Sequence, residues 1–257
     1  MEVYLPYPKS TITQRFGENA NPLYAGQGLK GHPAYDWGVP WGTDVPNCVA
    51  NAYCYSVMHK DDPTLMDYRA VFTLVEDGDV VYEVSYGHLS EIDAVVGQTY
   101  QVGDILGKVG NTGPVFAGSH EVTEAEKDAG SHAGAHLHGP QIRVCKKVKT
   151  IVSGPGIFNH YLMDENGFYK DADGNYYEVP DYQNGYNGCI SLAPFSTETI
   201  ASDQKTLAEA EAQIVTTATN ITAQVAQLPK DQQKVYISPL KALVDKIVAY
   251  FKSRSKI

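Results

Sequence analysis

The chain has 257 residues, 43% of them hydrophobic and 19% charged, which is enough for one large globular domain or for a domain with an appendage. Its formal net charge of -10 is uneven, because residues 1–198 carry a net charge of -13 and residues 199–257 carry +3. So acidic a body excludes nucleic-acid binding by bulk electrostatic attraction. The sequence contains no run of about 20 apolar residues, which excludes a transmembrane helix. Its four cysteines are too few and too scattered for a disulfide scaffold.

Residues 1–150 are predicted to form an antiparallel β-sheet domain. Short β-rich runs alternate there with Gly, Pro and Asn. The runs 70–75 and 80–86 flank the turn sequence Glu76-Asp77-Gly78-Asp79 and therefore predict a hairpin. A further strand is expected at 141–144, so the predicted fold class is mainly β.

Residues 151–198 are predicted to extend this domain with an aromatic β-hairpin. Many tyrosines lie there between the turn signals Asn166-Gly167, Asp173-Gly174 and Asn184-Gly185. A tyrosine packs its ring and leaves its hydroxyl in water. The tyrosines are therefore suited either to cover a small sheet or to hold a sugar or peptide, and both interpretations stay open.

Residues 199–257 are predicted to form an α-helical hairpin appendage. Before Pro229 ends the first helix, apolar residues recur at every seventh position, at Ile200, Leu207, Ile214, Ile221 and Leu228. A second helix is expected from about Pro239, with apolar residues on one face and lysines elsewhere. An antiparallel hairpin is favoured over a self-association seam or a docking element for a larger assembly.

Four short segments carry the residues suited to chemistry. They are His32-Pro33-Ala34-Tyr35-Asp36, Tyr86-Gly87-His88-Leu89, His136-Leu137-His138 and the glycine-punctuated run 103–113, which ends in Asn111-Thr112-Gly113 and carries no obvious ligand. A His and an Asp four residues apart can converge on a metal when the chain between them bends. Two histidines at i and i+2 of a strand project from the same face of the sheet, with Leu137 turned into the core. Such a pair can place one imidazole on a metal and the other beside a water molecule.

In this order, over about residues 10–145, the segments resemble the motifs of the lysostaphin-type zinc endopeptidases of peptidoglycan. The family's motifs are H-x-x-x-D, then Tyr-Gly-His-Leu, then Gly-Asp-x-Ile-Gly with Asn-Thr-Gly, then H-x-H. The resemblance implies a lysostaphin-like antiparallel β-sheet core of the duplicated hybrid motif type, with a groove above the sheet. It implies that His32, Asp36 and His138 bind Zn²⁺. It also implies that His88 and His136 are the catalytic pair.

Physical reasoning agrees with these implied roles. Three protein ligands leave a fourth tetrahedral position for water, as in catalytic zinc sites. Zinc can lower the pKa of that water to about 7 and polarise a carbonyl group. His136 is favoured as the general base because it neighbours His138 on the same face, and His88 is favoured as the oxyanion donor.

The chain departs from the family motifs in three places. Pro33-Ala34-Tyr35 stands where the family usually has a glycine between the first His and the Asp. Residues 114–135 form an insertion that we expect to border the groove and to shape specificity. They bring in His120 and His132, which are alternative ligands or catalytic groups. The usual aromatic-acidic pair after His138 is replaced by Gly139-Pro140-Gln141, which predicts a less regular strand.

The resemblance implies hydrolysis of peptide bonds in peptidoglycan stem peptides or cross-bridges. A non-catalytic wall-binding or phage-structural module on the same scaffold and a zinc amidase that cuts the sugar–peptide bond remain the alternatives. Residues 1–6 lack the basic start and apolar stretch of a secretory leader. We therefore expect a phage endolysin, held in the host cytoplasm until lysis, or a virion-associated lysin. Its C-terminal helices would then bind the phage particle, the cell wall or a second copy of the chain.

Overall fold

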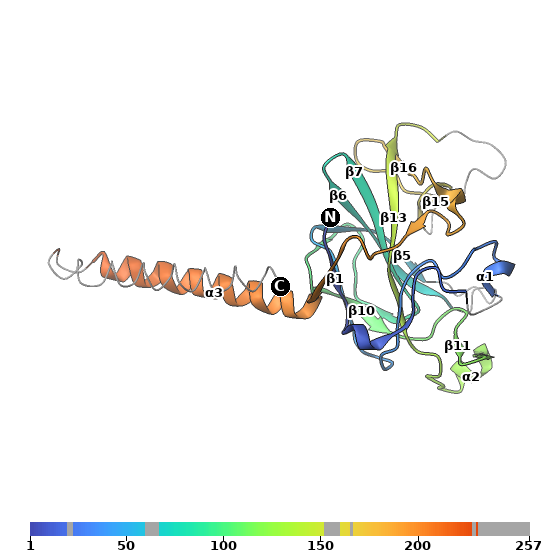
Figure 1. The fold of residues 1–257 in the computed structure, drawn as a ribbon. Helices are drawn as coiled ribbons and strands as arrows, with labels where there is room; N and C mark the ends of the chain where they lie inside the picture. Colours follow the sequence, from blue (N-terminus) through green and yellow to red (C-terminus); the bar gives the residue numbers. More distant parts are fainter. Residues whose placement is uncertain (20–22, 60–66, 152–159, 165–166, 228–229, 231–257) are drawn as a thin grey trace.

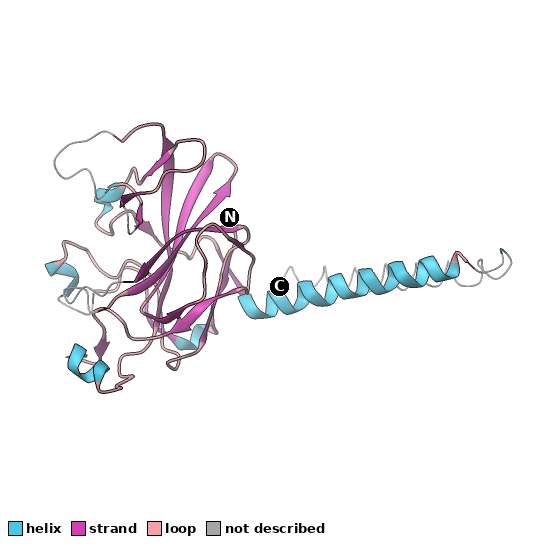
Figure 2. Ribbon diagram, turned by 180° about the vertical axis from the view of Figure 1, so that it is seen from behind, coloured by secondary structure: helices cyan, strands magenta, loops and turns pink. Residues whose placement is uncertain are grey.

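The computed structural model describes residues 1–19, 23–59, 67–151, 160–164, 167–227 and 230. It consists of a mainly antiparallel β body from which one long helix projects, and the view from behind shows the same arrangement (Figures 1 and 2). The prediction of a mainly β, antiparallel fold class is confirmed. None of the described helices is both long and apolar enough to cross a lipid bilayer.

The structure contains short strands, three α-helices and two 3-10 helices within the described residues. The strands are β1 (Val3–Leu5), β2 (Ile12–Gln14), β3 (Asp36–Trp37), β4 (Asp44–Pro46), β5 (Ala52–His59), β6 (Arg69–Asp77), β7 (Val80–Gly87), β8 (Leu89–Ile92), β9 (Thr99–Tyr100), β10 (Ile105–Val109), β11 (Phe116–Ala117), β12 (His120–Glu121), β13 (Leu137–Val148), β14 (Met163–Asp164), β15 (Gly167–Phe168), β16 (Tyr176–Glu178), β17 (Cys189–Ile190) and β18 (Ser196–Ile200). The helices are η1 (Lys9–Thr11), α1 (Leu23–Gly26), α2 (Glu124–Asp128), η3 (Tyr182–Asn184) and α3 (Ala201–Val225).

The largest sheet has the strand order β2-β3-β13-β7-β6-β5-β9, and β16 and β17 also pair with β13. Strands β6 and β7 form the predicted hairpin, paired without a shift from Ala70 opposite Gly87 to Asp77 opposite Val80. At its beginning β13 lies between β3 and β7, so that His138 is opposite Asp36 on one side and Gly87 on the other. Three of the chemical segments of the sequence thus meet at adjacent strands.

A second sheet of order β4-β10-β8 contributes to the same hydrophobic core as the large sheet. Val45, Leu106 and Leu89 from the small sheet and Leu137 from β13 are fully buried there. Burying each such side chain contributes on the order of 1.5–3 kcal/mol to folding. The burial of Leu137 confirms that the residue between the two histidines points into the core. All four cysteines are buried and free.

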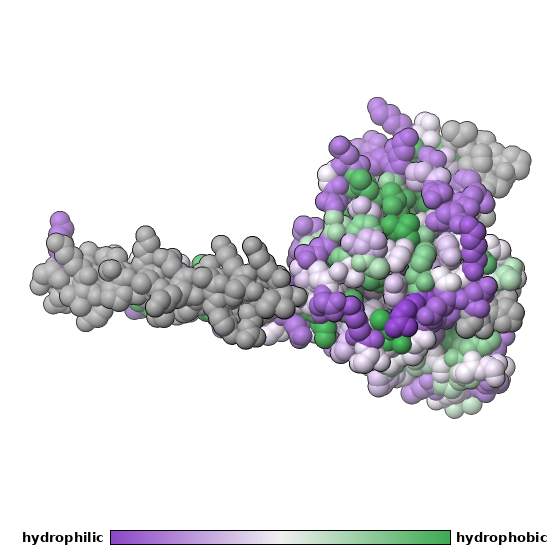
Figure 3. All heavy atoms as spheres, viewed as in Figure 1, coloured by the Kyte–Doolittle hydropathy of each residue, from purple (hydrophilic) through white to green (hydrophobic). Residues whose placement is uncertain are grey.

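The segment predicted as an aromatic extension joins the large sheet. Strands β16 and β17 pair with β13, and β14 pairs with β15 in a separate two-stranded sheet, with β15 lying near β16 and β13 in Figure 1. Tyr177 packs against Tyr169, which contacts Tyr55 on β5, with ring centroids 5.3 and 4.9 Å apart. These tyrosines therefore cover one face of the sheet. On the face seen in Figure 3, hydrophobic residues gather over the region of β7 and β13 between hydrophilic ones.

Helix α3 begins at Ala201, directly after β18. Strand β18 pairs in parallel with β1, and its last residue, Ile200, is opposite Leu5. Ile200 was predicted to lie in the helix but belongs to this strand, because its backbone pairs with the body. The predicted boundary between residues 198 and 199 therefore falls within β18. Pro229 and the second predicted helix, from about Pro239, lie outside the described residues.

Candidate metal centre

Two adjacent strands and one loop bring three metal-binding side chains together. Asp36 on β3 and His138 on β13 form a directly opposed antiparallel pair, which places their side chains on the same face. His32 precedes β3, and its backbone exchanges hydrogen bonds of 2.8 Å with Glu18 and Gly17. His32 and Asp36 are buried, and the side chain of His138 is 14% exposed. The residues predicted to ligate zinc therefore converge.

The spacing of the three donor atoms fits one small cation. Asp36 Oδ1 lies 3.2 Å from His32 Nε2 and 3.0 Å from His138 Nδ1, and the two nitrogens are 3.0 Å apart. Two ligands placed about 2.0–2.1 Å from a tetrahedral zinc ion would lie roughly 3.3 Å apart. The three residues form a possible metal-binding group within the described part of the chain. A donor set of two imidazoles and one carboxylate suits zinc.

The charges around Asp36 explain why a carboxylate is tolerated in this buried position. Burial by itself raises the pKa of the Asp36 carboxyl, but His136, His138 and His32 outweigh it and hold the pKa well below its ordinary value. Burial lowers the pKa of His32, and the nearby His138 lowers it further. Burial also lowers the pKa of His138, but the hydrogen bond to Asp36, the negative charge of Asp36 and the hydrogen bond to Gln141 together outweigh burial, and the net pKa is raised. The cluster thus keeps the Asp36 carboxylate ionised and makes His138 easier to protonate than His32.

His136 and His88 lie beside this group with their ring orientations fixed. His136 Nδ1 is 2.7 Å from the Gly134 carbonyl oxygen, and His88 Nδ1 is 2.6 Å from the Thr112 carbonyl oxygen. A carbonyl oxygen only accepts hydrogen bonds, so Nδ1 carries the proton in both rings and Nε2 is the free acceptor of each neutral ring. The ring centroids of His88 and His136 are 4.6 Å apart, and Nε2 of His136 is 3.6 Å from Asp36 Oδ1. The structure thus brings together all five residues predicted for the site.

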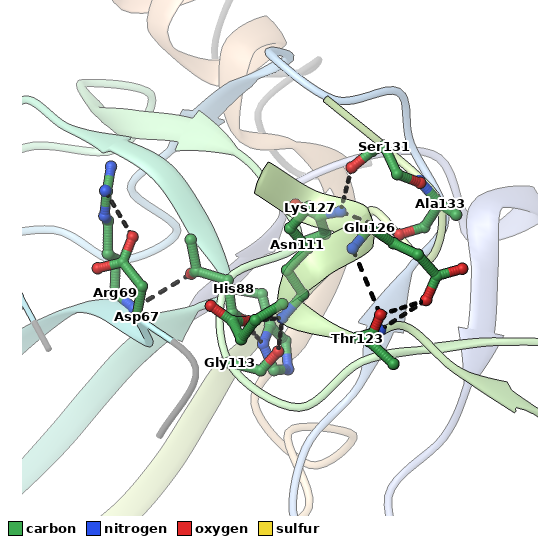
Figure 4. A network of polar contacts seen from close by, with 12 residues as sticks. Asp67, Arg69, His88, Asn111, Gly113, Thr123, Glu126, Lys127, Ser131 and Ala133 are labelled. Carbon is green, nitrogen blue, oxygen red and sulfur yellow. Dashed lines mark hydrogen bonds and ion pairs between the residues drawn. The ribbon is translucent and has the colours of Figure 1, made fainter. Parts of the chain in front are cut away.

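The turn Asn111-Thr112-Gly113 positions His88, although the sequence showed no ligand in that segment. His88 itself has a φ of 62°, in the left-handed region, and Thr112 Oγ1 donates to the Leu89 carbonyl beside it. The insertion holds the other side of the turn (Figure 4): Lys127 Nζ donates to the Gly113 carbonyl at 2.6 Å. Asn111 Nδ2 donates to the carbonyls of Ser131 and Ala133 at 2.9 and 3.1 Å. Residues 114–135 therefore brace the turn that orients a candidate catalytic histidine.

The structure places both alternative histidines of the insertion outside the three-residue group. His120 is exposed and pairs with Glu126, with Nε2 2.9 Å from its nearer carboxylate oxygen. His132 is exposed and stacks on Trp41, with ring centroids 4.2 Å apart and an angle of 2° between the planes. Each of these rings already has a partner of its own, so the geometry favours the originally predicted ligands.

Two residues near the site carried no signal that singled them out in the sequence. Tyr68 packs edge-on against His88, with ring centroids 5.3 Å apart. Burial raises the pKa of Tyr68 to about 12, so its hydroxyl stays protonated and can donate a hydrogen bond at neutral pH. Gln141 accepts from the second ring nitrogen of His138, with Oε1 2.9 Å from Nε2. Tyr68 is one of 18 tyrosines, and Gln141 was noted only as a departure from a motif.

Comparison with known proteins finds similar solved structures. No protein-family model matches the sequence, and no curated protein matches it. The catalytic domain of the prophage-encoded M23 protein EnpA from Enterococcus faecalis is 22% identical over 54% of this chain and 85% of that chain, with a TM-score of 0.36. The catalytic domain of the antimicrobial peptidase lysostaphin from Staphylococcus simulans is 17% identical over 76% of this chain and 89% of that chain, with a TM-score of 0.34.

A zinc-containing peptidase from Vibrio cholerae is 22% identical over 56% of this chain and 36% of that chain, with a TM-score of 0.34. Because the three TM-scores lie below 0.5, these structures do not decide what the chain does. The assignment of its site rests on the side chains of this protein.

Proposed function

We propose that this protein is a zinc-dependent endopeptidase that hydrolyses peptide bonds in peptidoglycan stem peptides or cross-bridges. The observation that carries the proposal is the convergence of His32 Nε2, Asp36 Oδ1 and His138 Nδ1 to mutual distances of 3.0–3.2 Å. Two further imidazoles lie beside them, each with its Nδ1 proton on a backbone carbonyl and Nε2 as the acceptor of the neutral ring. The substrate class comes from the order of the four sequence motifs.

In this proposal His32, Asp36 and His138 hold the zinc ion. When bound, zinc supplies Lewis-acid chemistry, since it lowers the pKa of a water molecule and polarises the scissile carbonyl. One carboxylate among three ligands leaves the site net positive, which favours the negative charge that develops on the carbonyl oxygen. Because the ligand side chains are buried, they would exclude bulk water from around the metal. Electrostatic interactions are stronger in such a low-dielectric environment than in water.

His136 is the general base of the proposed reaction. Its neutral ring presents Nε2, which accepts the proton of the attacking water while the water oxygen bonds to the carbonyl carbon. The carbon–nitrogen bond then breaks, and the same ring returns the proton to the leaving amine. The Gly134 carbonyl keeps Nδ1 protonated throughout and thereby fixes the orientation of the ring.

The fixed Nδ1 proton of His88 changes the role that we propose for this residue. Neutral His88 offers an acceptor at Nε2, so it could donate to an oxyanion only after gaining a second proton. Burial, together with His136 and His138, holds the pKa of His88 well below its ordinary value and opposes that protonation. We therefore assign His88 to accept a hydrogen bond from the water or from a substrate N–H group, and the protonated Tyr68 hydroxyl to donate to the oxyanion.

The test is digestion of purified peptidoglycan, with mass analysis of the soluble products. An endopeptidase releases fragments with a new peptide amine, whereas an amidase separates stem peptides from the sugar chain and a binding module releases nothing. Walls with glycine bridges and walls with direct cross-links would identify the bond. Release of unmodified glycan strands and intact stem peptides would contradict the proposal. The origin in a phage and the docking role of the C-terminal segment remain predictions.

A further inference from the structure

The clearest unexplained feature near the site is a chain of contacts that leads away from His138. The Nδ1 atom of His138 faces Asp36 and His32, and its Nε2 atom faces Gln141 Oε1 at 2.9 Å. On the other side of the amide, Gln141 Nε2 lies 2.8 Å from the sulfur of Cys189. Cys189 is 1% exposed and lies on β17, in the segment predicted as an aromatic extension.

We infer that Gln141, held by Cys189, is a positioning residue that fixes the tautomer and the orientation of His138 for metal binding. The inference rests on the proposed zinc site. Only an unprotonated Nδ1 can bind a metal, and a neutral imidazole then carries its proton on Nε2. The Gln141 carbonyl oxygen receives that proton in a hydrogen bond. Ligand histidines commonly need such a partner, which also raises the basicity of the ligating nitrogen.

The orientation of the Gln141 amide decides which nitrogen of His138 carries the proton. If the amide were turned over, its NH₂ group would face Nε2 of His138 and would favour a proton on Nδ1, which blocks metal binding. Cys189 opposes this flipped orientation of the Gln141 amide. Its thiol lies within donating distance of the Asn187 carbonyl, at 3.9 Å, and its sulfur is then an acceptor for the NH₂ group of Gln141. The thiol thus selects the amide orientation that leaves Oε1 for His138.

A β-bulge makes the contact between His138 and Gln141 possible. Residues three apart on a regular strand point to opposite faces. Here His138 is opposite Gly87 and Gln141 is opposite Ser85, so three steps along β13 match two steps along β7. The extra residue turns Gln141 to the face of His138.

Gly139, within the bulge, has a φ of 132°, and a Cβ built there would lie 2.5 Å from the Ser85 carbonyl oxygen. Its backbone is held at both ends, since its N–H donates to the Tyr35 carbonyl at 2.9 Å and its carbonyl accepts from Trp37 Nε1 at 2.7 Å. The replacement of the family's aromatic-acidic pair by Gly139-Pro140-Gln141 is therefore what brings the amide to the site. The position calls for glycine because both the φ and the space exclude a larger residue.

Strand β13 also holds β17 through Arg143, which lies two residues after Gln141 and on the same face of the strand. Arg143 Nε donates to the Asn187 carbonyl at 2.9 Å, and Arg143 Nη1 pairs with Oε1 of the buried Glu83 at 2.5 Å. Strands β13 and β17 also pair through Ile142 and Arg143. The loop that presents Cys189 is thus held by backbone and side-chain contacts, which lets its sulfur act as a fixed acceptor.

The test compares zinc dissociation constants of full-length variants by competition with a chromophoric chelator. Gln141→Met keeps the side-chain length but lacks an acceptor oxygen, and we expect its dissociation constant to rise by about 10- to 100-fold. Gln141→Glu keeps the oxygen, so its constant should stay within about threefold of wild type. Cys189→Ala should weaken binding by a smaller factor. Cys145→Ala is the matched control, because Cys145 is a buried thiol on β13 without a contact to Gln141 among the described residues, and its constant should not change.

A second measurement reports the tautomer directly. In the zinc-loaded wild type, ¹⁵N spectra of histidine-labelled protein should show His138 protonated on Nε2, and Cys189→Ala should broaden or shift that signal. A Gln141→Met constant equal to that of wild type would overturn the inference, as would equal weakening by Gln141→Met and Gln141→Glu. If Gln141→Met fails to fold, the Cys189→Ala and Gln141→Glu constants and the tautomer signal still decide. A wild type that binds no zinc would refute the metal site itself, whereas one that binds zinc but cleaves no peptidoglycan would refute only the proposed function.

Discussion

Replacement of Asp36 by asparagine removes the only anionic donor of the candidate metal centre while keeping its shape. Asp36 Oδ1 is the atom shared by the cluster, 3.0 Å from His138 Nδ1, 3.2 Å from His32 Nε2 and 3.6 Å from His136 Nε2. In the metal-free protein two effects oppose each other. The variant loses charge-assisted hydrogen bonds worth about 1.5–3 kcal/mol, but it no longer pays the cost of desolvating a buried carboxylate. We therefore expect the metal-free unfolding free energies to differ by less than about 2 kcal/mol.

The thermal stabilities of the wild type and of Asp36→Asn should differ once zinc is added. A ligand present at about 100 times its dissociation constant stabilises the folded state by about 2.7 kcal/mol. For a protein of this size that corresponds to an increase in Tm of roughly 5–10 °C for the wild type. Asp36→Asn should gain less than about 2 °C under the same conditions, because its affinity for zinc is lost.

Thermal unfolding followed by circular dichroism, with and without zinc, measures this difference. Glu126→Gln is the matched control, because Glu126 is also a carboxylate paired with a histidine, His120, but lies outside the cluster. Its increase in Tm should equal that of the wild type. A zinc-induced increase in Asp36→Asn as large as in the wild type would refute the assignment of Asp36 as a ligand.

Three further predictions concern catalysis, pH and the C-terminal segment. His136→Ala and His88→Ala should each lower the turnover of peptidoglycan fragments by about 10²-fold or more while one zinc per chain stays bound. Loss of zinc from both variants would instead identify these histidines as metal ligands. Zinc binding should weaken as pH falls, because protons compete with zinc for the imidazole nitrogens, and His138, whose pKa is raised, should protonate before His32, whose pKa is lowered. Calorimetry in buffers of different ionisation enthalpy counts the protons that zinc displaces. A zinc affinity that does not change between pH 8 and 5.5 would contradict the ligand set. A chain truncated after residue 208 keeps β18 and the contact of Lys205 with Asp104, so it should retain zinc and cut soluble fragments at close to the full rate. Truncation after residue 198 cuts β18 and should lower Tm. An equal loss of activity on soluble and insoluble substrates in the chain that ends at residue 208 would show that the helix braces the body.

The parts of the structure that the sequence predicted are those with a local or periodic signal. The turn at 76–79 predicted the β6–β7 hairpin, and period-two alternation placed His136 and His138 on one face with Leu137 in the core. The order of the motifs predicted which side chains meet. The turn and the alternation depend on chain geometry within a few residues, so they survive folding largely unchanged. The motif order instead carries information through its resemblance to a known family.

The parts that the sequence did not predict depend on contacts between distant segments. A backbone carbonyl, that of Thr112, orients His88, and no side-chain pattern reports such an acceptor. Gln141 faces the site because of a one-residue bulge, and without it period-two alternation would place this side chain on the other face of the sheet. Cys189 lies 48 residues beyond Gln141 in the chain, so only the pairing of β17 with β13 brings them together. The seven-residue repeat likewise assigned Ile200 to a helix, although β-pairing with the body takes precedence there.

The most direct test of the proposed metal centre is the anomalous scattering of zinc in crystals of the zinc-loaded protein, measured on both sides of the absorption edge. We predict one strong peak per chain, about 2.0–2.2 Å from each of His32 Nε2, Asp36 Oδ1 and His138 Nδ1. His136 and His88 should lie outside ligating distance, with Nε2 of each ring turned towards the open coordination position. A peak bound instead by His120 or His132, or no peak within reach of Asp36 in crystals soaked with zinc, would contradict the account.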